Sequence, residues 1–361
     1  MGMSKSKLPL RWVVPVLVLV LLLAAELTLR VRQFSNRGTL GLVYDFVLHE
    51  PTGLRIPVPG WDNGIVQIDK LGFRSPELEI PKPARRKRIA FLGGSTTFCA
   101  EVSSNERTWP ARLVASLAES SGESIDYLNA SVPGYTVQAS RKTFESRVAS
   151  TEPDTVLVYH AYNDLVRDCR ELAIAEGRKR PEAQIDWLGR YSLLWHLLRQ
   201  NFLIRRRVRQ EQDRGPLDPD MDALAGPFEE RLLALVDSIK ATGAEPVLVT
   251  FCYRGRTGME LEELERVSAS ALRYIPYLDA EGIVRGIEAY NEAIRRVARG
   301  SGAILLEGDG VVAPDDENFI DAVHLLDPGC IALADALLLQ LSEHHAETRP
   351  VEATFQVQVP R

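Results

Sequence analysis

The stretch Arg88-Ile89-Ala90-Phe91-Leu92-Gly93-Gly94-Ser95-Thr96-Thr97 (RIAFLGGSTT, 88–97) decides the fold. Its apolar run, closed by two glycines, is typical of a buried strand that ends in a tight turn. Ser95 then lies just beyond the carboxyl end of that strand. Ligands of open parallel sheets bind at this edge, so the stretch predicts an α/β domain with a hydroxyl group at its functional edge. Taken alone, a Gly-Gly-Ser turn is also an ordinary structural turn.

The rest of the chain alternates between short apolar runs and helical stretches. Further strands are expected at 125–128, 155–159, 246–251 and 303–306, with helices at 109–120, 137–148, 228–242, 287–299 and 329–341. Strands that alternate with helices predict a parallel sheet covered on both faces. The expected fold class is therefore α/β, a three-layer flavodoxin-like fold with a five-stranded parallel sheet, a helical insertion between strands 3 and 4, and an N-terminal transmembrane anchor.

The insertion, 166–227, has an amphipathic centre. Residues 178–209 hold nine basic residues against two acidic ones. Aromatic and leucine side chains recur there at helical spacing: Trp187, Tyr191, Leu194, Trp195, Leu198 and Phe202. Two interpretations stay open. One is a basic amphipathic helix that lies on a membrane or over the active site; the other is a cap helix that packs on the sheet with its charges in water.

An apolar run near the N-terminus points to a membrane. Every residue from Trp12 to Ala25 is apolar or proline, and the mainly apolar stretch continues to about Leu29. Three basic residues, Lys5, Lys7 and Arg11, precede it. A membrane span needs about 20 apolar residues. We favour an uncleaved signal anchor over 1–33, in contact with the membrane through 12–29; a cleaved signal peptide and a buried core helix remain alternatives. The domain that follows the anchor is then extracytoplasmic, periplasmic or at the cell surface, although arginines beyond the run weaken the charge argument for orientation.

The overall composition is that of a globular protein. The chain has 361 residues, 25% charged and 45% hydrophobic, with a net charge of −6. These values exclude a disordered chain, a collagen and a polytopic membrane protein, and no basic excess supports nucleic-acid binding. Residues 1–37 carry a net +5, which leaves −11 for the remainder. The sequence thus predicts an acidic domain behind a basic-flanked anchor.

The domain boundaries follow from composition. Residues 34–87 are rich in proline and glycine and are expected to form an extended approach segment. The basic run Arg85–Arg88 is interpreted as a solvated linker at its end. The main α/β domain is expected over 88–345, followed by a tail over 346–361.

Polar residues follow the other predicted strands at the same edge. Gly134, in a Pro-Gly turn after the second strand, can present a backbone N–H, and Asn163 after the third strand can donate an amide. Asp321 and His324 stand before the last helix, where the carboxylate can orient the imidazole as a base. Gly134 also has an ordinary structural interpretation as a Pro-Gly turn, and Asn163 as a loop cap. Neither a Gly-Lys-Ser/Thr loop nor Gly-x-Gly-x-x-Gly occurs, and no Cys-x-x-Cys or His-x-x-x-His pair supports a metal, so we expect neither cofactor nor metal.

Taken together and in this order, these blocks resemble the SGNH/GDSL hydrolase (lipase/esterase) family over about 88–341. The nucleophile block resembles 93–97, the glycine block 129–134, the asparagine block 161–164 and the Asp-x-x-His block 321–324. The segment 71–74 (LGFR) also looks like one found in membrane-anchored members. Three positions depart from the family pattern: Gly94 replaces its usual aspartate, and Ser131 and Ala161 replace glycines.

The resemblance implies a serine esterase that hydrolyses an ester through an acyl-enzyme. Ser95 would be the nucleophile, His324 the base and Asp321 its orienting carboxylate, with an oxyanion hole made by Ser95, Gly134 and Asn163. The implied partner is an ester substrate, carbohydrate or lipid, such as an O-acyl group in the cell envelope. Two alternatives remain: an acyltransferase with the same triad, and a catalytically silent envelope-assembly or binding protein.

Four cysteines complete the inventory: Cys99, Cys169, Cys252 and Cys330. In an oxidising compartment they allow up to two disulfides, and buried free thiols are the equal alternative.

Overall fold

The central element is a five-stranded parallel sheet. The computed structural model describes residues 10–37, 46–178, 192–199, 202, 206, 209–211 and 213–348. The strands of the sheet are β3 (Lys87–Gly93), β4 (Ile125–Asn129), β5 (Thr155–Tyr159), β6 (Glu245–Val249) and β7 (Ile304–Leu306), in the order β4-β3-β5-β6-β7. All four pairings are parallel. The predicted sheet of an α/β flavodoxin-like fold is confirmed.

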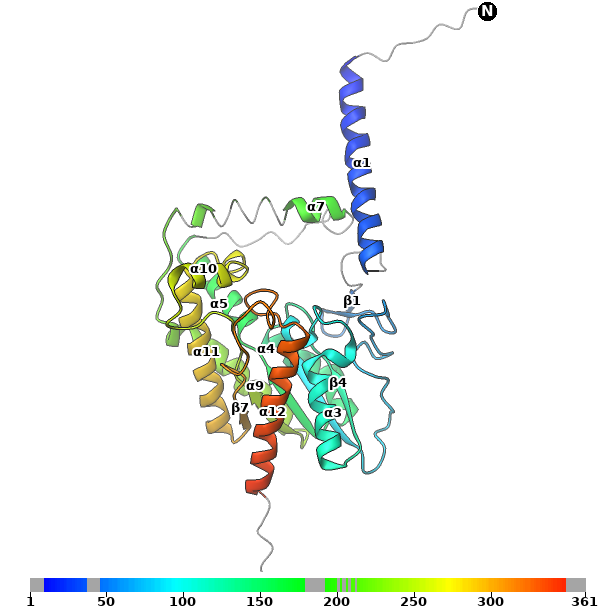
Figure 1. Cartoon of the computed structure of the whole chain (residues 1–361), viewed down its shortest axis with the longest axis vertical. Helices are drawn as coiled ribbons and strands as arrows, with labels where there is room; N and C mark the ends of the chain where they lie inside the picture. The colour runs from blue at the N-terminus through cyan, green and yellow to red at the C-terminus, as the bar shows by residue number, and fades with distance from the viewer. Residues whose placement is uncertain are drawn as a thin grey trace, which may run out of the picture.

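Helices cover both faces of the sheet (Figure 1). One layer holds α3 (Trp109–Ser121) and α12 (Asp327–Thr348), which contact each other; the other holds α4 (Val137–Thr143), α9 (Met221–Lys240) and α11 (Ala280–Ser301). The interior strand β3 is buried on both faces because helices pack on each side. Short helices connect the longer elements of the domain: α2 (Ser95–Phe98), η1 (Asn105–Arg107), η2 (Phe144–Val148), η3 (Ala149–Thr151), α10 (Leu261–Ser268) and η5 (Ala271–Arg273).

Local sequence signals set several helix ends. Thr108 accepts a hydrogen bond from the Ala111 N–H and so caps α3, which ends at Gly122 in the left-handed conformation. The helix expected from 228 begins earlier, at Met221, because Asp220 accepts from the N–H groups of residues 222 and 223 and caps that position. Pro227 lies inside α9.

The expected insertion is framed by long helices. α5 (Tyr162–Ala175) follows β5 directly and runs through the expected start at residue 166, while α9 begins before the expected end at 227. Between them the structure describes α7 (Leu193–Leu198) and a few further residues. Trp187 and Tyr191, part of the predicted amphipathic pattern, lie outside the described residues.

The approach segment packs against the domain. It contains an antiparallel hairpin, β1 (Phe46–His49) and β2 (Leu54–Pro57), and it buries Phe73 and Arg74. The interpretation of Arg85–Arg88 as a solvated linker is wrong at Arg88, whose side chain is fully buried. Its guanidinium makes two hydrogen bonds of 2.8 and 2.9 Å to Asp126 and one to the carbonyl of Thr151. A partner 38 residues away in the sequence thus overrides the local run of charges.

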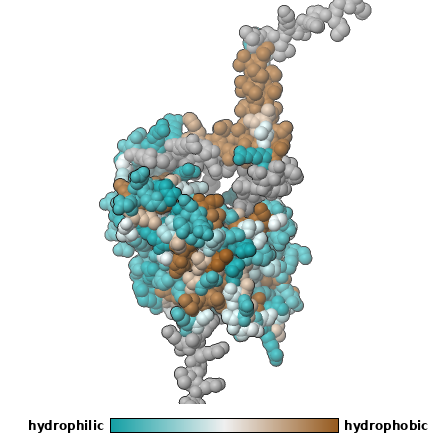
Figure 2. Space-filling model, viewed as in Figure 1, coloured by the Kyte–Doolittle hydropathy of each residue, from teal (hydrophilic) through white to brown (hydrophobic). Residues whose placement is uncertain are grey.

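The N-terminal helix α1 (Leu10–Arg37) extends away from the domain (Figure 1). Its residues 11–32 are long and apolar enough to cross a membrane by length and composition, and none of the most apolar window is buried. Figure 2 shows this helix as an apolar column above a mostly polar domain.

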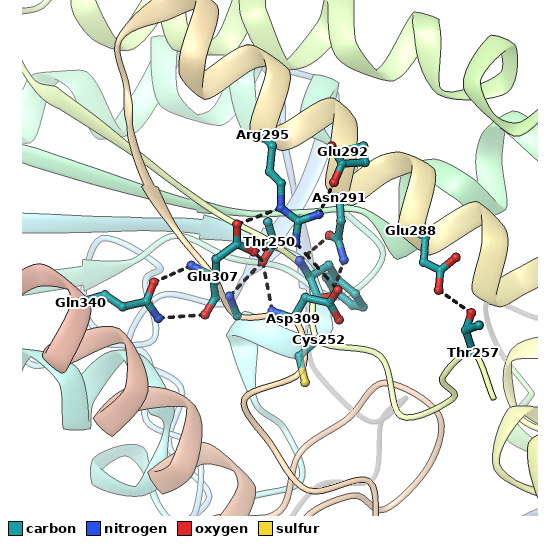
Figure 3. Close-up of polar contacts among 12 residues, drawn as sticks. Thr250, Cys252, Thr257, Glu288, Asn291, Glu292, Arg295, Glu307, Asp309 and Gln340 are labelled. Carbon is teal, nitrogen blue, oxygen red and sulfur yellow. Dashed lines mark hydrogen bonds and ion pairs between the residues drawn. The ribbon is translucent and has the colours of Figure 1, made fainter. Parts of the chain in front are cut away.

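A polar network fastens the carboxyl ends of β6 and β7 (Figure 3). The Glu307 carboxylate accepts two hydrogen bonds from the guanidinium of Arg295 in α11, at 2.8 and 2.7 Å. It also accepts one from the Thr250 hydroxyl at 2.8 Å. Gln340 of α12 bonds both backbone groups of Glu307, and Asn291 does the same for Phe251. Both flanking helix layers therefore hold the base of the loop that leads to residues 321–324.

Candidate active site

Ser95 begins the four-residue helix α2 at the carboxyl end of β3. The two glycines before it are required by close contacts. A Cβ at Gly93 would collide with the Thr97 hydroxyl, and one at Gly94 would lie 2.5 Å from the Asn163 amide nitrogen. In this chain the Asn163 amide lies in the space that a side chain at 94 would enter.

The loop before α12 brings His324 to Ser95. The His324 Nε2 lies 2.8 Å from the Ser95 Oγ, and its Nδ1 lies 2.8 Å from Asp321 Oδ2. An ionised carboxylate can only accept, so Nδ1 carries the proton and Nε2 is free to accept from the hydroxyl. The other oxygen of Asp321 accepts from the N–H groups of Val323 and His324, each at 2.9 Å, which fixes the carboxylate.

The electrostatics of this trio favour a basic imidazole. Burial opposes the positive charge on His324, but the hydrogen bond and charge of Asp321, with the charge of Glu101, outweigh it and raise the pKa of His324 above its ordinary 6.5. Burial alone would raise the pKa of Asp321, but the hydrogen bond and charge of His324 and two backbone N–H groups outweigh it and lower that pKa. The pair is therefore set up to hold an imidazolium when one forms.

Three donor groups belong to the residues expected to form an oxyanion hole, Ser95, Gly134 and Asn163. In the part of the chain that the structure describes, the backbone N–H groups of Ser95 and Gly134 have no hydrogen-bond acceptor. Gly134 has a φ of +84°, with open space where a Cβ would stand. The Asn163 amide nitrogen donates one hydrogen to the Tyr135 carbonyl at 2.8 Å, which fixes the side chain next to Gly94. The same nitrogen carries a second hydrogen.

A buried acidic network holds the helix that carries Asn163. Asp164 accepts from the Val137 N–H at 3.0 Å, and Arg231 binds Asp168 at 2.6 Å. Burial raises the pKa of Asp164 to about 7. These contacts tie α5 to α4 and α9, so the position of Asn163 is set by two other helices.

Two further residues at the site were given no role by the sequence. The Arg74 guanidinium, fully buried, donates 2.6 Å hydrogen bonds to the carbonyls of Phe98 and Cys99 at the end of α2, and a 2.8 Å bond to Asn105. Glu101 is close enough to affect His324, and burial raises its own pKa. Arg74 belongs to the LGFR segment, which the sequence marks only by resemblance; nothing local marks Glu101.

A small pocket adjoins Ser95. It is lined by residues from the ends of β3, β5 and β6, namely Gly94, Ser95, Thr96, Tyr159, His160, Ala161, Tyr162, Asn163 and Phe251. His160 is buried against Ser140, with its Nε2 2.8 Å from that hydroxyl, and burial lowers its pKa to about 3. It is therefore a neutral wall of the pocket.

The four cysteines are buried free thiols. The sulfur atoms of Cys99 and Cys330 lie 4.0 Å apart. Within residues 10–37, 46–178 and the other described ranges, no group of three or more His, Cys, Asp or Glu side chains is placed to hold a metal ion.

Comparison with known proteins identifies the family. Residues 91–330, more than half of the chain, match the model of the GDSL-like Lipase/Acylhydrolase family. No curated protein sequence gives a significant match.

Similar solved structures include Axe2, an acetylxylan esterase from Geobacillus stearothermophilus, with 16% identity, a TM-score of 0.45, and coverage of 71% of this chain and 94% of Axe2. A putative GDSL-like lipase from Parabacteroides merdae has 15% identity, a TM-score of 0.43, and coverage of 71% and 95%. LAE5, an α/β hydrolase from the Lake Arreo metagenome, has 17% identity, a TM-score of 0.44, and coverage of 71% and 95%. On the family match, the chain belongs to the GDSL-like lipase/acylhydrolase family and is a serine hydrolase that acts on ester bonds.

Proposed function

We propose that Ser95, His324 and Asp321 are the catalytic triad of this hydrolase. The observation that carries the proposal is the chain of two 2.8 Å contacts from the Ser95 hydroxyl through the imidazole to the Asp321 carboxylate. Such a chain supplies a nucleophile, its base and the group that orients the base.

In the proposed reaction, the Ser95 Oγ attacks the ester carbonyl while His324 Nε2 takes its proton. The resulting imidazolium is stabilised by Asp321 and then protonates the departing alcohol as the tetrahedral intermediate collapses to an acyl-enzyme. A water molecule, deprotonated by His324, attacks that acyl group, and collapse of the second intermediate returns the proton to Ser95. Both half-reactions use one base at one position.

The oxyanion of each intermediate is proposed to bind the N–H groups of Ser95 and Gly134 and the second amide hydrogen of Asn163. The support is that the two backbone donors have no acceptor among the described residues, and that the Tyr135 carbonyl fixes the amide. Donors fixed before the reaction are effective because they need no reorganisation when charge develops.

For the substrate we propose an O-acyl group on a carbohydrate or another cell-envelope molecule. The pocket beside Ser95 is narrow and walled by rigid aromatic side chains, including Tyr159 and Phe251, which stack with ring centroids 4.9 Å apart. These walls favour a short acyl group such as acetyl over a long fatty chain.

The proposed location rests on the N-terminal helix. We propose that α1 is an uncleaved membrane anchor, that 88–345 is the catalytic domain outside the cytoplasm, and that 46–87 packs on it as part of the same unit. The exposed apolar surface of α1 supports an anchor, and the burial of Phe73 and Arg74 supports the packing.

A panel of p-nitrophenyl esters of increasing chain length tests the proposal on the full chain in detergent. We expect hydrolysis of the acetyl ester to exceed that of the octanoyl ester, and Ser95→Ala to abolish both. The matched control is Ser120→Ala, an exposed serine on α3, which should retain full activity. Equal activity of Ser95→Ala and wild type would remove the triad assignment; transfer of the acyl group to an added sugar alcohol in preference to water would favour the transferase.

A further inference from the structure

Helix α7 lies across the base of α1 (Figure 1). We use the name α7 segment for the described residues 192–199, 202, 206 and 209–211. The two helices are in contact although more than 150 residues separate them in the chain. The contact is made by specific polar groups.

Glu26 is the acidic residue that interrupts the apolar face of α1, and its carboxylate caps α7. It accepts from the backbone N–H groups of Leu193 at 3.0 Å and Leu194 at 2.8 Å, and from the Ser192 hydroxyl at 2.9 Å. Arg30, one turn further along α1, donates to the same carboxylate at 2.7 Å. A helix N-terminus attracts a carboxylate, and Arg30 balances its charge, so the start of α7 is fixed to α1 at the level of Glu26.

That level lies in the outer part of the membrane core. Glu26 follows Trp12 by 14 residues, which at 1.5 Å per residue is about 21 Å along the helix, so with Trp12 at one face of a bilayer core about 30 Å thick, Glu26 lies about 9 Å from the other face. A helix fixed crosswise there lies within about 10 Å of the headgroups, the depth to which amphipathic helices bury their apolar faces. The span of α1 therefore sets the depth of α7.

The composition of the exposed surface fits this depth. Leu193 is buried, whereas Trp195, Leu198 and Phe202 are 40%, 50% and 68% exposed. Trp195 and Leu198, three residues apart, lie on one face of α7, and Phe202 is exposed further along the same segment. Arg199, Arg206 and Arg209 are exposed along the same segment. Figure 2 shows apolar surface beside the base of α1, continuous with that helix. Aromatic and leucine side chains with flanking arginines are typical of an interfacial helix on anionic lipid.

We propose that the α7 segment is an interfacial helix that inserts Trp195, Leu198 and Phe202 into an anionic phospholipid surface of the membrane that α1 spans. This inference rests on the proposed anchor. It also orients the enzyme: α5 starts at the carboxyl end of β5, and both α5 and α10 lie on the side of the domain that faces α7 (Figure 1). The catalytic edge of the sheet is thus turned toward the membrane, and the ester substrate is one presented at the lipid surface.

The test places an environment-sensitive fluorophore, NBD, at single introduced cysteines of the full chain in vesicles of phosphatidylcholine and phosphatidylglycerol. The four native cysteines are buried, which favours labelling of the introduced one. The variants are Phe202→Cys, the control Leu339→Cys on an exposed position of α12, and Leu19→Cys inside the apolar run of α1. Quenching by lipids that carry a shallow nitroxide reports contact with acyl chains.

We expect the probe at 202 to shift to the blue and to be quenched by the nitroxide lipid, the probe at 339 to stay in water, and the probe at 19 to lie in lipid. Glu26→Leu should abolish most of the quenching at 202 and leave that at 19 unchanged, because it removes the cap without making α1 more polar. Loss of the anionic lipid should also reduce the signal at 202.

Each other outcome has a definite meaning. A probe at 202 that stays in water while the probe at 19 is quenched overturns the inference and leaves the anchor intact. A blue shift at 202 without lipid quenching indicates a protein partner and also overturns it. A probe at 19 in water overturns the anchor, and the inference with it.

Discussion

Asp321→Asn separates the role of the carboxylate charge from that of the loop around it. An asparagine at 321 keeps the oxygen that accepts from the N–H groups of Val323 and His324, so the turn that carries the histidine is retained. Its amide group, however, would face His324 Nδ1, which now donates to Asp321 at 2.8 Å. The amide can only donate there, and it therefore favours the tautomer with the proton on Nε2, which cannot accept from Ser95.

The expected loss in kcat is about 10⁴-fold, or roughly 5.5 kcal/mol, the size found when an orienting carboxylate of a serine hydrolase is replaced by its amide. Stability should change little, because the two backbone contacts of residue 321 survive. Asp335→Asn, an exposed carboxylate on α12, controls for the loss of one charge and should keep full activity.

The assay is steady-state hydrolysis of p-nitrophenyl acetate across pH, with thermal unfolding measured in parallel. His324 acts as a base only when deprotonated, and its folded pKa is raised. Wild-type kcat/KM should thus fall with acidification through a midpoint above 6.5, and the midpoint of the residual activity of Asp321→Asn should lie lower. A kcat within about tenfold of wild type, with an unmoved midpoint, would refute the reasoning.

Three further variants test the surroundings of the proposed triad. Asn163→Ala should slow turnover about 100-fold with little change in folding, since one proposed oxyanion donor is lost. Steady-state kinetics measure the loss in kcat, and thermal unfolding measures stability. A kcat within about a factor of two of wild type contradicts the role of Asn163 as an oxyanion donor. Glu101→Gln should lower the acid midpoint of kcat/KM, because it removes a carboxylate that raises the pKa of His324; a titration that leaves the midpoint in place disproves the coupling. Arg74→Met should lower the free energy of unfolding by about 2–5 kcal/mol, since two buried carbonyls at the end of α2 lose their donor; a melting temperature equal to that of Arg170→Met, an exposed arginine, counts against this assignment.

The sheet and the candidate site could be predicted because their signals are local. Each strand of the sheet is a short apolar run, and parallel strands bring their carboxyl ends to one edge whatever the details of packing. Residues as distant in sequence as Ser95 and His324 were therefore predicted to meet, and the structure places them 2.8 Å apart. The topology of the fold therefore accounts for most of the predicted proximity of these residues.

What the sequence left unpredicted depends on single contacts between distant segments. The charge run at 85–88 is typical of a solvated linker, but Asp126 and the Thr151 carbonyl surround the Arg88 guanidinium. Arg74 contacts the end of α2 from 24 residues away. Glu26 caps a helix that starts 167 residues later. No periodicity or motif encodes such pairs, because each partner is an ordinary polar residue in its own neighbourhood.

The central claim is that Ser95 carries the acyl group during turnover. The most direct measurement is mass spectrometry of peptides from the full chain after reaction with a fluorophosphonate, beside Ser95→Ala treated in the same way. The account predicts one phosphonylated residue, Ser95, and no labelling of the variant. Labelling at another residue, or equal labelling of Ser95→Ala, would contradict it.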